Sequence, residues 1–445
     1  MDSARDGARA HASSWQSRVR RPAWLDATGE WFRDRARLLD SPLATHHVLL
    51  ATTSVLVVIG LVMVLSSSSV EALTNYGSPY YFFKNQAMYA VIGAIALMVA
   101  SRVPAVAWQR LAVPALLATA FLQLLVFVPG IGVTVNGNRS WIELGPLRGQ
   151  PSEAGKIALV LALALALSRR REVLHEPVKL AAAMALPVGL TVGIVLLSRD
   201  LGTALVMMAV VAVMLWVAGI PAKWFALAAG GGALIATLAV VTSQNRMSRV
   251  HDWLFGTADT TEAIQGLAWQ PVHAKYALAS GSWWGLGLGA SREKWSWLPE
   301  AHNDFIFAVI GEELGLPGTL TIVVLFGVLA LAAMRLVKRS ENLYTKLAVA
   351  GIGAWILGQA CLNMGVVLSL LPVIGVPLPL ISAGGSALVL TLFGIGILLS
   401  FARAEPGAPE AIRARESVVA RSLAVLPHRG RRGPRDTSRK RPTKG

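Results

Sequence analysis

The fold of this chain is decided at Trp295–Gly315, which reads WSWLPEAHNDFIFAVIGEELG. The stretch ends a polar, Trp-rich segment and begins a long apolar one. It contains four acids and one histidine: Glu300, His302, Asp304, Glu312 and Glu313. Ionisable side chains at the entrance to a membrane are costly to place, and they are therefore candidate functional groups. We interpret the rest of the sequence as the scaffold that holds this boundary in position.

The composition is that of a polytopic membrane protein. Of 445 residues, 54% are hydrophobic and 15% are charged, and the mean hydropathy is +0.55. Soluble proteins carry about a quarter charged residues. Apolar runs near the length needed to cross about 30 Å of hydrocarbon recur along the chain. They predict an all-α protein with ten spans: His47–Ser66, Phe83–Ser101, Leu111–Val128, Gly155–Leu167, Leu180–Leu197, Leu201–Val217, Trp224–Val241, Asp304–Met334, Leu347–Leu370 and Ala387–Phe401.

The loops between these spans alternate in charge, with Lys and Arg gathered on one side. Because cytoplasmic loops carry the excess of Lys and Arg, both termini are expected in the cytoplasm. Loops 129–154 and 242–303 are then extracellular, the second lying between spans seven and eight. The predicted domains are a basic, disordered cytoplasmic extension (1–46), a ten-helix membrane domain (47–402) and a basic, disordered cytoplasmic tail (403–445).

The net charge of +16 is concentrated at the C-terminus. After Phe401 there are twelve Lys and Arg against four Asp and Glu, a net +8 that makes up half of the excess. This composition favours a disordered tail held near anionic membrane lipids. Docking to a cytoplasmic partner is the alternative, and nucleic acid is disfavoured. The single cysteine, Cys361, excludes a disulfide framework or a Cys-based metal site within one chain.

Asp304 has two interpretations. It could cap the helix that follows, because Asp or Asn before an apolar run satisfies free N–H groups. Asn303 could cap equally well, which would leave Asp304 free for catalysis. The residues alone leave both interpretations open.

The other acids of the stretch suggest structural roles. Glu312 and Glu313 lie about two turns further along and would be costly at that depth unless paired, so we expect ion pairs with Lys or Arg from a neighbouring span. Glu300 and His302 are expected to structure the loop around Asp304. A lone His–acid cluster lacks the spacing of a metal-binding helix, so no metal site is predicted.

Five cations are assigned to the same external side as Asp304: Arg139, Arg148, Lys156, Arg199 and Lys275. Together they could face a phosphate-bearing substrate and stabilise a diphosphate leaving group. Alternatively, Glu143, Glu153 and Asp200 would satisfy them in ion pairs that contribute little at a surface.

Several motifs, in order, resemble the SEDS family (shape, elongation, division, sporulation) between about Ser41 and Arg403. They are NRSWIELG (Asn138–Gly145), QPSEAGK (Gln150–Lys156), DLGTALV (Asp200–Val206), the run Gly285–Gly315 and IGVPLPLISAGGS (Ile374–Ser386). The division branch is resembled more than the elongation branch. Asn303 replaces the family's usual Thr, Ser198-Arg199 replaces Gln-Pro, and ISAGGSA replaces ISYGGSS.

The resemblance implies ten transmembrane helices and a peptidoglycan glycosyltransferase that polymerises lipid II at the outer face of the cytoplasmic membrane, during division at the septum. It implies that Asp304 is catalytic. From their assigned place beside Asp304 or on the same outer side, Arg139, Lys156, Lys275, Glu300 and His302 are expected to contact the substrate, and Glu153, Glu312 and Glu313 are expected in structural ion pairs. Implied partners are a class B penicillin-binding protein with transpeptidase activity and divisome activator proteins. A divalent cation, Mg²⁺ or Mn²⁺, is left open. The rival functions are a lipid II flippase and a non-catalytic divisome scaffold.

Overall fold

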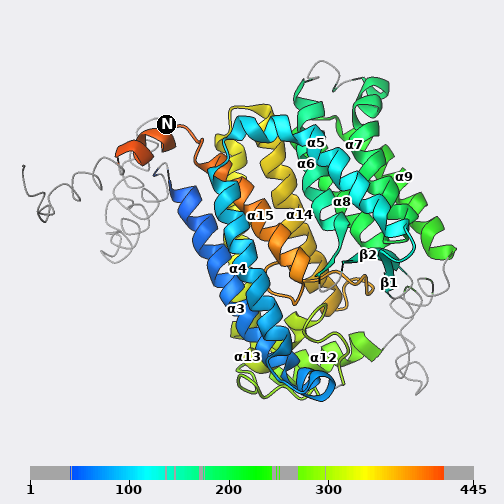
Figure 1. Ribbon diagram of the computed structural model, residues 1–445, viewed down its shortest axis with the longest axis vertical. Coiled ribbons are helices and arrows are strands. Elements are labelled where there is room, and N and C mark those ends of the chain that lie inside the picture. The colour runs from blue at the N-terminus through cyan, green and yellow to red at the C-terminus, as the bar shows by residue number, and fades with distance from the viewer. Residues whose placement is uncertain are drawn as a thin grey trace, which may run out of the picture.

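The computed structural model describes residues 41–414, apart from 42, 136–137, 145–146, 170–173, 175, 243–246, 248–249, 251–268 and 296. Most of the predicted extension and tail lies outside these residues. The long helices are α3 (Ala44–Tyr76), α4 (Tyr81–Arg102), α5 (Ala105–Leu124), α6 (Pro151–Arg169), α7 (Pro177–Leu197), α8 (Leu201–Val217), α9 (Ala222–Val241), α13 (Ile306–Arg339), α14 (Leu343–Val367) and α15 (Gly385–Ala402). A shorter helix, α12 (Trp269–Gly281), precedes α13 (Figure 1).

A helical, multi-span membrane protein is confirmed. Each of the ten predicted spans overlaps one of the long helices. Within the described residues, eight helices are at least 18 residues long and apolar enough to cross a membrane. Helix α8 is equally apolar but has 17 residues. The number of ten crossings therefore stays a prediction.

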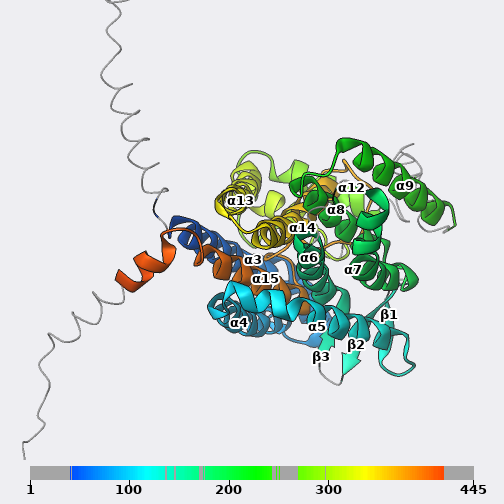
Figure 2. The same ribbon diagram turned by 90° about the horizontal axis from the view of Figure 1, so that it is seen from above.

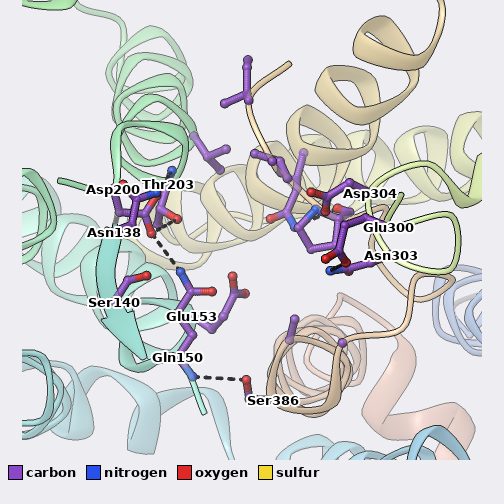
Figure 3. A pocket seen from close by; sticks show the side chains of 18 of the residues that line it. Asn138, Ser140, Gln150, Glu153, Asp200, Thr203, Glu300, Asn303, Asp304 and Ser386 are labelled. Atoms are coloured by element: carbon purple, nitrogen blue, oxygen red, sulfur yellow. Dashed lines mark hydrogen bonds between the residues drawn. The ribbon is translucent and has the colours of Figure 1, made fainter. Parts of the chain in front are cut away.

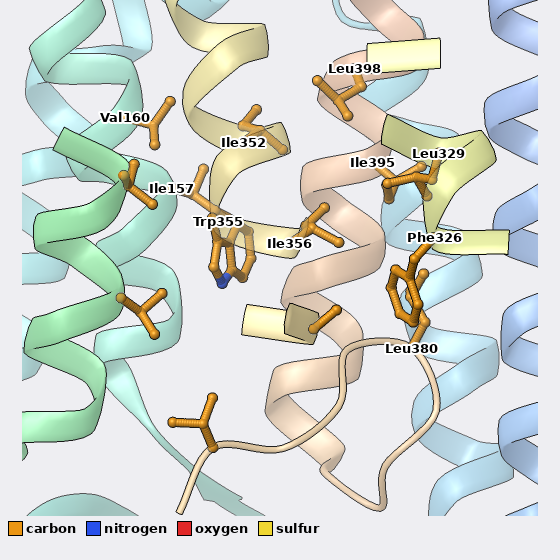
Figure 4. Close-up of a cluster of buried hydrophobic side chains, with 14 of the residues drawn as sticks. Ile157, Val160, Phe326, Leu329, Ile352, Trp355, Ile356, Leu380, Ile395 and Leu398 are labelled. Atoms are coloured by element: carbon orange, nitrogen blue, oxygen red, sulfur yellow. The ribbon is translucent and has the colours of Figure 1, made fainter. Parts of the chain in front are cut away.

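Helices α6 and α14 form the centre of the bundle, with the other helices around them (Figure 2). Every residue of α6 from Gly155 to Leu165 is buried, because α5, α7, α8 and α14 all pack against it. Figure 4 shows the core, where Trp355 and Ile356 of α14 lie between Val160 of α6 and Ile395 of α15. A helix that is apolar on all sides suits this central position.

Peripheral helices bury small residues and expose large apolar ones. Helices α4 and α15 pack closely at Gly93 and Gly396, where an added Cβ would lie 2.5 Å from Leu392 Cδ1 and 2.7 Å from the Leu97 carbonyl oxygen. The outward face of α4 carries Val91 and Ile95, both exposed. This arrangement is typical of helices in lipid, where small residues mediate contact and apolar side chains face the tails.

Helix α13 is sharply bent at Gly315, whose φ of 65° and ψ of −158° lie outside the helical region. Pro317 follows two residues later and lacks the N–H that would continue the helical hydrogen bonding. A Cβ on Gly311 would lie 3.2 Å from Thr319 Cγ2, so the two halves fold toward each other at the bend. The predicted single span therefore consists of a short buried helix, 306–314, and a long one, 316–339.

The loop predicted at 129–154 contains structure that the all-α prediction omitted. Strands β1 (Gly132–Val135), β2 (Asn138–Leu144) and β3 (Leu147–Gly149) form an antiparallel sheet in the order β1-β2-β3. Gly132 pairs with Ile142, and Glu143 pairs with Arg148. The backbone N–H of Arg139 also donates to the carbonyl of Ser198, which ties the sheet to the turn between α7 and α8.

The two ends of the bundle differ in charge. Arg102, Arg169 and Arg339 close α4, α6 and α13 at the same end, which we call the basic end. The sheet and α12 lie at the opposite end, the pocket end (Figure 1). The fold also continues past residue 402, because Glu405 and Ala408 are buried at the basic end.

Candidate active site

A polar pocket of about 260 Å³ opens at the pocket end (Figure 3). Its wall on one side comes from the turn before α13, with Glu300, Asn303 and Asp304. The other wall comes from the sheet and the start of α8, and the connector between α14 and α15 closes the space between them. The lining residues include Asn138, Ser140, Gln150, Glu153, Lys156, Asp200, Thr203, Gln359, Gly375 and Ser386.

The backbone around Asp304 is held by three successive hydrogen bonds. The carbonyl of His302 accepts from the N–H of Ala383 at 3.0 Å, and that of Asn303 accepts from Ser382 Oγ at 2.7 Å. The carbonyl of Asp304 accepts from Asn363 Nδ2, also at 2.7 Å. A side chain fixed in this way is preorganised for chemistry, because its backbone cannot shift without breaking several bonds.

The N-cap position of α13 is occupied by Phe305 and by neither Asn303 nor Asp304. The Phe305 side chain makes no capping hydrogen bond. The turn before it is closed instead by the Glu300 carbonyl, which accepts from the N–H groups of Asn303 and Phe305. Glu300 has a φ of 58°, an unfavourable value for a residue with a side chain. Such strain is found where the surrounding structure holds a functional turn in place.

The pocket floor combines a buried ion pair with an aromatic ring. Lys156 Nζ lies 2.8 Å from Glu153 Oε1 and 2.9 Å from Gln359 Oε1. It also lies 4.9 Å from the centroid of the Trp355 ring. Glu153 and Lys156 stand three residues apart on α6, so one helix turn brings them together. Lys156 therefore forms an ion pair with Glu153, which was predicted to take part in one, and both residues line the pocket.

The wall opposite Asp304 was not predicted as a site. Asp200 caps α8 by accepting from the N–H of Thr203 at 3.0 Å, and it also accepts from Thr203 Oγ1 and Gln150 Nε2. Gln150 in turn donates its N–H to Ser386 Oγ at 3.3 Å (Figure 3). These residues lie in the quoted motifs DLGTALV, QPSEAGK and ISAGGS, which was the available signal.

Three of the predicted substrate-binding residues do not line this pocket. The His302 ring packs against Phe82, with ring centroids 4.5 Å apart, and its Nδ1 lies 3.3 Å from Glu71 Oε2. Lys275 is exposed on α12. Arg139 lies on β2 between two lining residues, and its side chain is absent from the described lining.

Glu312 and Glu313 are buried at the bend of α13, away from the pocket. Glu313 accepts from Ser66 Oγ on α3, and its Oε1 lies 3.5 Å from Lys294 Nζ. Glu312 accepts from Ser291 Oγ at 2.5 Å and from the N–H of Arg292 at 2.9 Å. The cation beside them thus comes from the loop before α13 rather than from a neighbouring span.

The formal charge of the pocket is unexpectedly negative. The described lining contains the carboxylates of Glu153, Asp200, Glu300 and Asp304 but one ammonium group, that of Lys156. Of the five outer cations, Lys156 is the one that the described lining includes. The expectation of several fixed cations beside the base is therefore wrong for the described part of the pocket.

The depth of the pocket follows from helix lengths. Asn363 lies twenty residues after Leu343, where α14 begins at the basic end. At 1.5 Å per residue, this is about 30 Å, the thickness of a hydrocarbon core. Because Asn363 contacts Asp304, the pocket lies about one hydrocarbon thickness away from the basic end.

Comparison with known proteins agrees with these features. A family model described as a cell cycle protein, FtsW/RodA/SpoVE, matches residues 46–406. The chain is 37% identical over 395 residues to a probable peptidoglycan glycosyltransferase FtsW of Mycobacterium tuberculosis, covering 87% of this chain and 74% of that protein. It is 37% identical over 376 residues to the protein of that name from Trichlorobacter lovleyi, covering 83% and 95%.

Solved structures show the same likeness. A chain of a structure described as a peptidoglycan synthase complex that coordinates polymerisation and crosslinking aligns with a TM-score of 0.65 and 28% identity, over 80% of this chain and 97% of that chain. The rod shape-determining protein RodA of Thermus thermophilus aligns with a TM-score of 0.59 and 28% identity, over 80% and 96%. From the match over 46–406 and these relatives, the chain belongs to the FtsW/RodA/SpoVE family of cell cycle proteins, the SEDS family.

Proposed function

We propose that this protein is a peptidoglycan glycosyltransferase that polymerises lipid II into glycan strands during cell division. The relatives named FtsW support the reaction class. The observation that carries the proposal is the position of Asp304. It is a half-buried carboxylate on a rigid turn, at the wall of a polar pocket, at the depth of a membrane boundary.

In this proposal Asp304 is the general base. Its carboxylate takes the proton of the acceptor sugar's 4-hydroxyl as that oxygen attacks the anomeric carbon of the donor. The bond to the lipid diphosphate breaks, and the diphosphate leaves with the bonding electron pair. One displacement inverts the anomeric centre to a β-1,4 link. A single carboxylate suffices, because a diphosphate leaves without being protonated.

Lys156 and Glu300 are proposed to contact the sugars or the diphosphate, because both line the pocket. His302, Lys275 and Arg139 have weaker support, since their side chains are absent from the described lining. Carboxylates outnumber cations around the pocket, so we propose that the diphosphate arrives with a divalent cation. Oxygen ligands of this kind suit Mg²⁺ or Mn²⁺. Omission of the metal and chelation with EDTA test this requirement.

The outer face of the cytoplasmic membrane is the proposed place of reaction. The basic end carries Arg102, Arg169 and Arg339, and the charge rule assigns that end to the cytoplasm. The pocket then faces outward, where glycan strands are built. Labelling of single cysteines placed at either end, in intact cells, measures this orientation.

Two further proposals concern partners. The likeness to a chain of a peptidoglycan synthase complex supports assembly with a class B penicillin-binding protein that crosslinks the strands. Divisome activator proteins and location at the septum are inferred from the division branch of the family. Fluorescence of a tagged protein at the septum or along the sidewall separates a division role from an elongation role.

The decisive experiment is polymerisation of lipid II by the purified protein with its transpeptidase partner. Wild-type protein should form glycan strands, and Asp304→Asn should form none while still binding lipid II. Polymer from Asp304→Asn at the wild-type rate would exclude Asp304 as the base. Absence of polymer from the wild type with every partner tested would favour the rival functions, a lipid II flippase or a non-catalytic scaffold.

A further inference from the structure

Residues 282–297, which we call the aromatic loop, connect α12 to the turn that carries Glu300 and Asp304. The loop contains Trp283, Trp284, Trp295 and Trp297. Trp283 and Trp284 are 69% and 85% exposed, although they follow directly on the buried end of α12. Two adjacent exposed indoles require an explanation, because large exposed apolar patches mark interaction sites.

The start of the aromatic loop is fixed to the bend of α13. The N–H groups of Leu286 and Gly287 donate to the carbonyls of Glu312 and Glu313, both at 2.9 Å. The break at Gly315 and the missing N–H of Pro317 remove helical donors that these carbonyls would otherwise accept from. A Cβ on Gly315 would lie 2.7 Å from the Trp283 carbonyl oxygen. The backbone of Trp283 and Trp284 is therefore held against the bend of α13.

The bend marks one end of an apolar stripe on the long half of α13. The stripe consists of exposed aliphatic side chains that the helical repeat places on one face: Leu316, Leu320, Val323, Val324, Leu331 and Met334. Met334 lies eighteen residues after Leu316, about 27 Å along the helix, which matches a hydrocarbon core of about 30 Å. Lys338 and Arg339 follow at its other end, as expected just beyond the hydrocarbon.

Trp283 and Trp284 thus lie immediately past the outer end of a surface that fits the lipid tails. Trp is enriched at this depth, because its ring is apolar while its N–H reaches the polar headgroups. From this continuity we propose that Trp283 and Trp284 form an interfacial anchor, embedded among the lipid headgroups of the leaflet at the pocket end. Bilayer lipid therefore covers the exposed faces of Trp283, Trp284 and the stripe on α13.

The anchor sets the depth of the aromatic loop and, through it, the turn at Glu300. The loop continues from the anchored residues to Lys294 and Leu298, which are buried against the bundle. A change in membrane thickness would therefore shift the aromatic loop, because the bend of α13 connects the anchored residues to the rest of that loop. This inference stands on exposure and helix length, and it does not depend on the proposed reaction.

Spin-label depth measurements test the anchor. In a Cys361→Ala background, Trp284→Cys is labelled in nanodiscs, and its accessibility to oxygen is compared with that to a water-soluble nickel complex. Leu320→Cys provides the lipid reference, because Leu320 lies within the stripe. Tyr76→Cys provides the water reference, because Tyr76 ends α3 thirty-two residues after Ala44, about 48 Å along the helix.

The oxygen-to-nickel ratio at Trp284→Cys should lie between the two references and shift toward that of Leu320→Cys. A ratio equal to that of Tyr76→Cys overturns the proposal. So does a label that becomes shielded from nickel only when the transpeptidase partner is added, since that surface would then bind protein. If Trp284→Cys does not fold, Trp283→Cys carries the same comparison.

Discussion

The buried cluster at the bend of α13 gives the sharpest stability prediction. Glu312 and Glu313 are 0% and 1% exposed, and the ammonium group of Lys294 lies 3.5 Å from Glu313. Lys294→Met removes that charge and keeps most of the side-chain volume. Ser66 and the N–H of Ser291 still donate to Glu313, so the carboxylate keeps hydrogen bonds and loses its counterion.

The magnitude follows from the distance. Two unit charges 3.5 Å apart attract by about 5 kcal/mol at an effective dielectric constant of 20. Breaking one partner of a buried pair costs about 3–5 kcal/mol in measured cases. Because the remaining hydrogen bonds compensate in part, we expect the lower end, about 3 kcal/mol, a change of roughly 100-fold in the unfolding equilibrium.

The assay is equilibrium unfolding in mixed micelles, followed by tryptophan fluorescence. The double variant Lys294→Met/Glu313→Gln should recover most of the loss, because it also removes the carboxylate charge that faces Lys294. Coupling of about 1.5–3 kcal/mol in the double-mutant cycle is expected for such a contact. Lys275→Met is the matched control on exposed α12, with an expected change within about 0.5 kcal/mol.

The electrostatic reasoning is refuted if Lys294→Met is as stable as Lys275→Met. It is equally refuted if the double variant is less stable than either single variant, because the two groups would then contribute independently. Cleavage of the aromatic loop by protease should increase in Lys294→Met, since Lys294 also donates to the Gly289 carbonyl at 2.5 Å.

Three further predictions follow from the site and the basic end. Gly375→Ala should reduce polymerisation in the lipid II assay, because Gly375 has a φ of 74° and the added methyl would lie 3.6 Å from Asp304 Oδ2. An unchanged polymerisation rate would contradict the position of Gly375 beside Asp304 in the pocket wall. Asn363→Leu should lower the polymerisation rate more than it weakens lipid II binding. It should also reduce the free energy of unfolding by about 1–3 kcal/mol, because the Asp304 and Val376 carbonyls lose the Asn363 Nδ2 donor. Equal losses of rate and binding would argue against a positioning role for Asn363. Burial raises the pKa of Glu405 above its ordinary 4.5, although the nearby Thr45 hydroxyl and the Arg339 guanidinium act to lower it. The folded state therefore binds this proton more tightly, and its stability falls as pH rises from 4.5. Glu405→Gln should flatten that fall in thermal unfolding scans, and an identical pH slope would show that Glu405 does not titrate in this window.

The sequence by itself determined the helical membrane fold and the position of the key turn. Long apolar runs specify spanning helices because backbone groups in lipid must be satisfied within each segment. The motif set also selected Asp304 among five ionisable residues. These features depend on short stretches of sequence or on composition, and they can therefore be predicted from the sequence without the structure.

Only the tertiary structure decided which groups meet at the pocket. Asp200 and Asp304 are more than one hundred residues apart, and they face the same space because α8, the sheet and the connector after α14 converge there. The His302 ring packs against Phe82, and the Arg139 side chain is absent from the described lining, although both residues are close in sequence to lining residues. The bend at Gly315 likewise depends on the aromatic loop, whose N–H groups satisfy the carbonyls of Glu312 and Glu313. Packing between distant segments fixes these contacts, and spacing along the chain does not encode them.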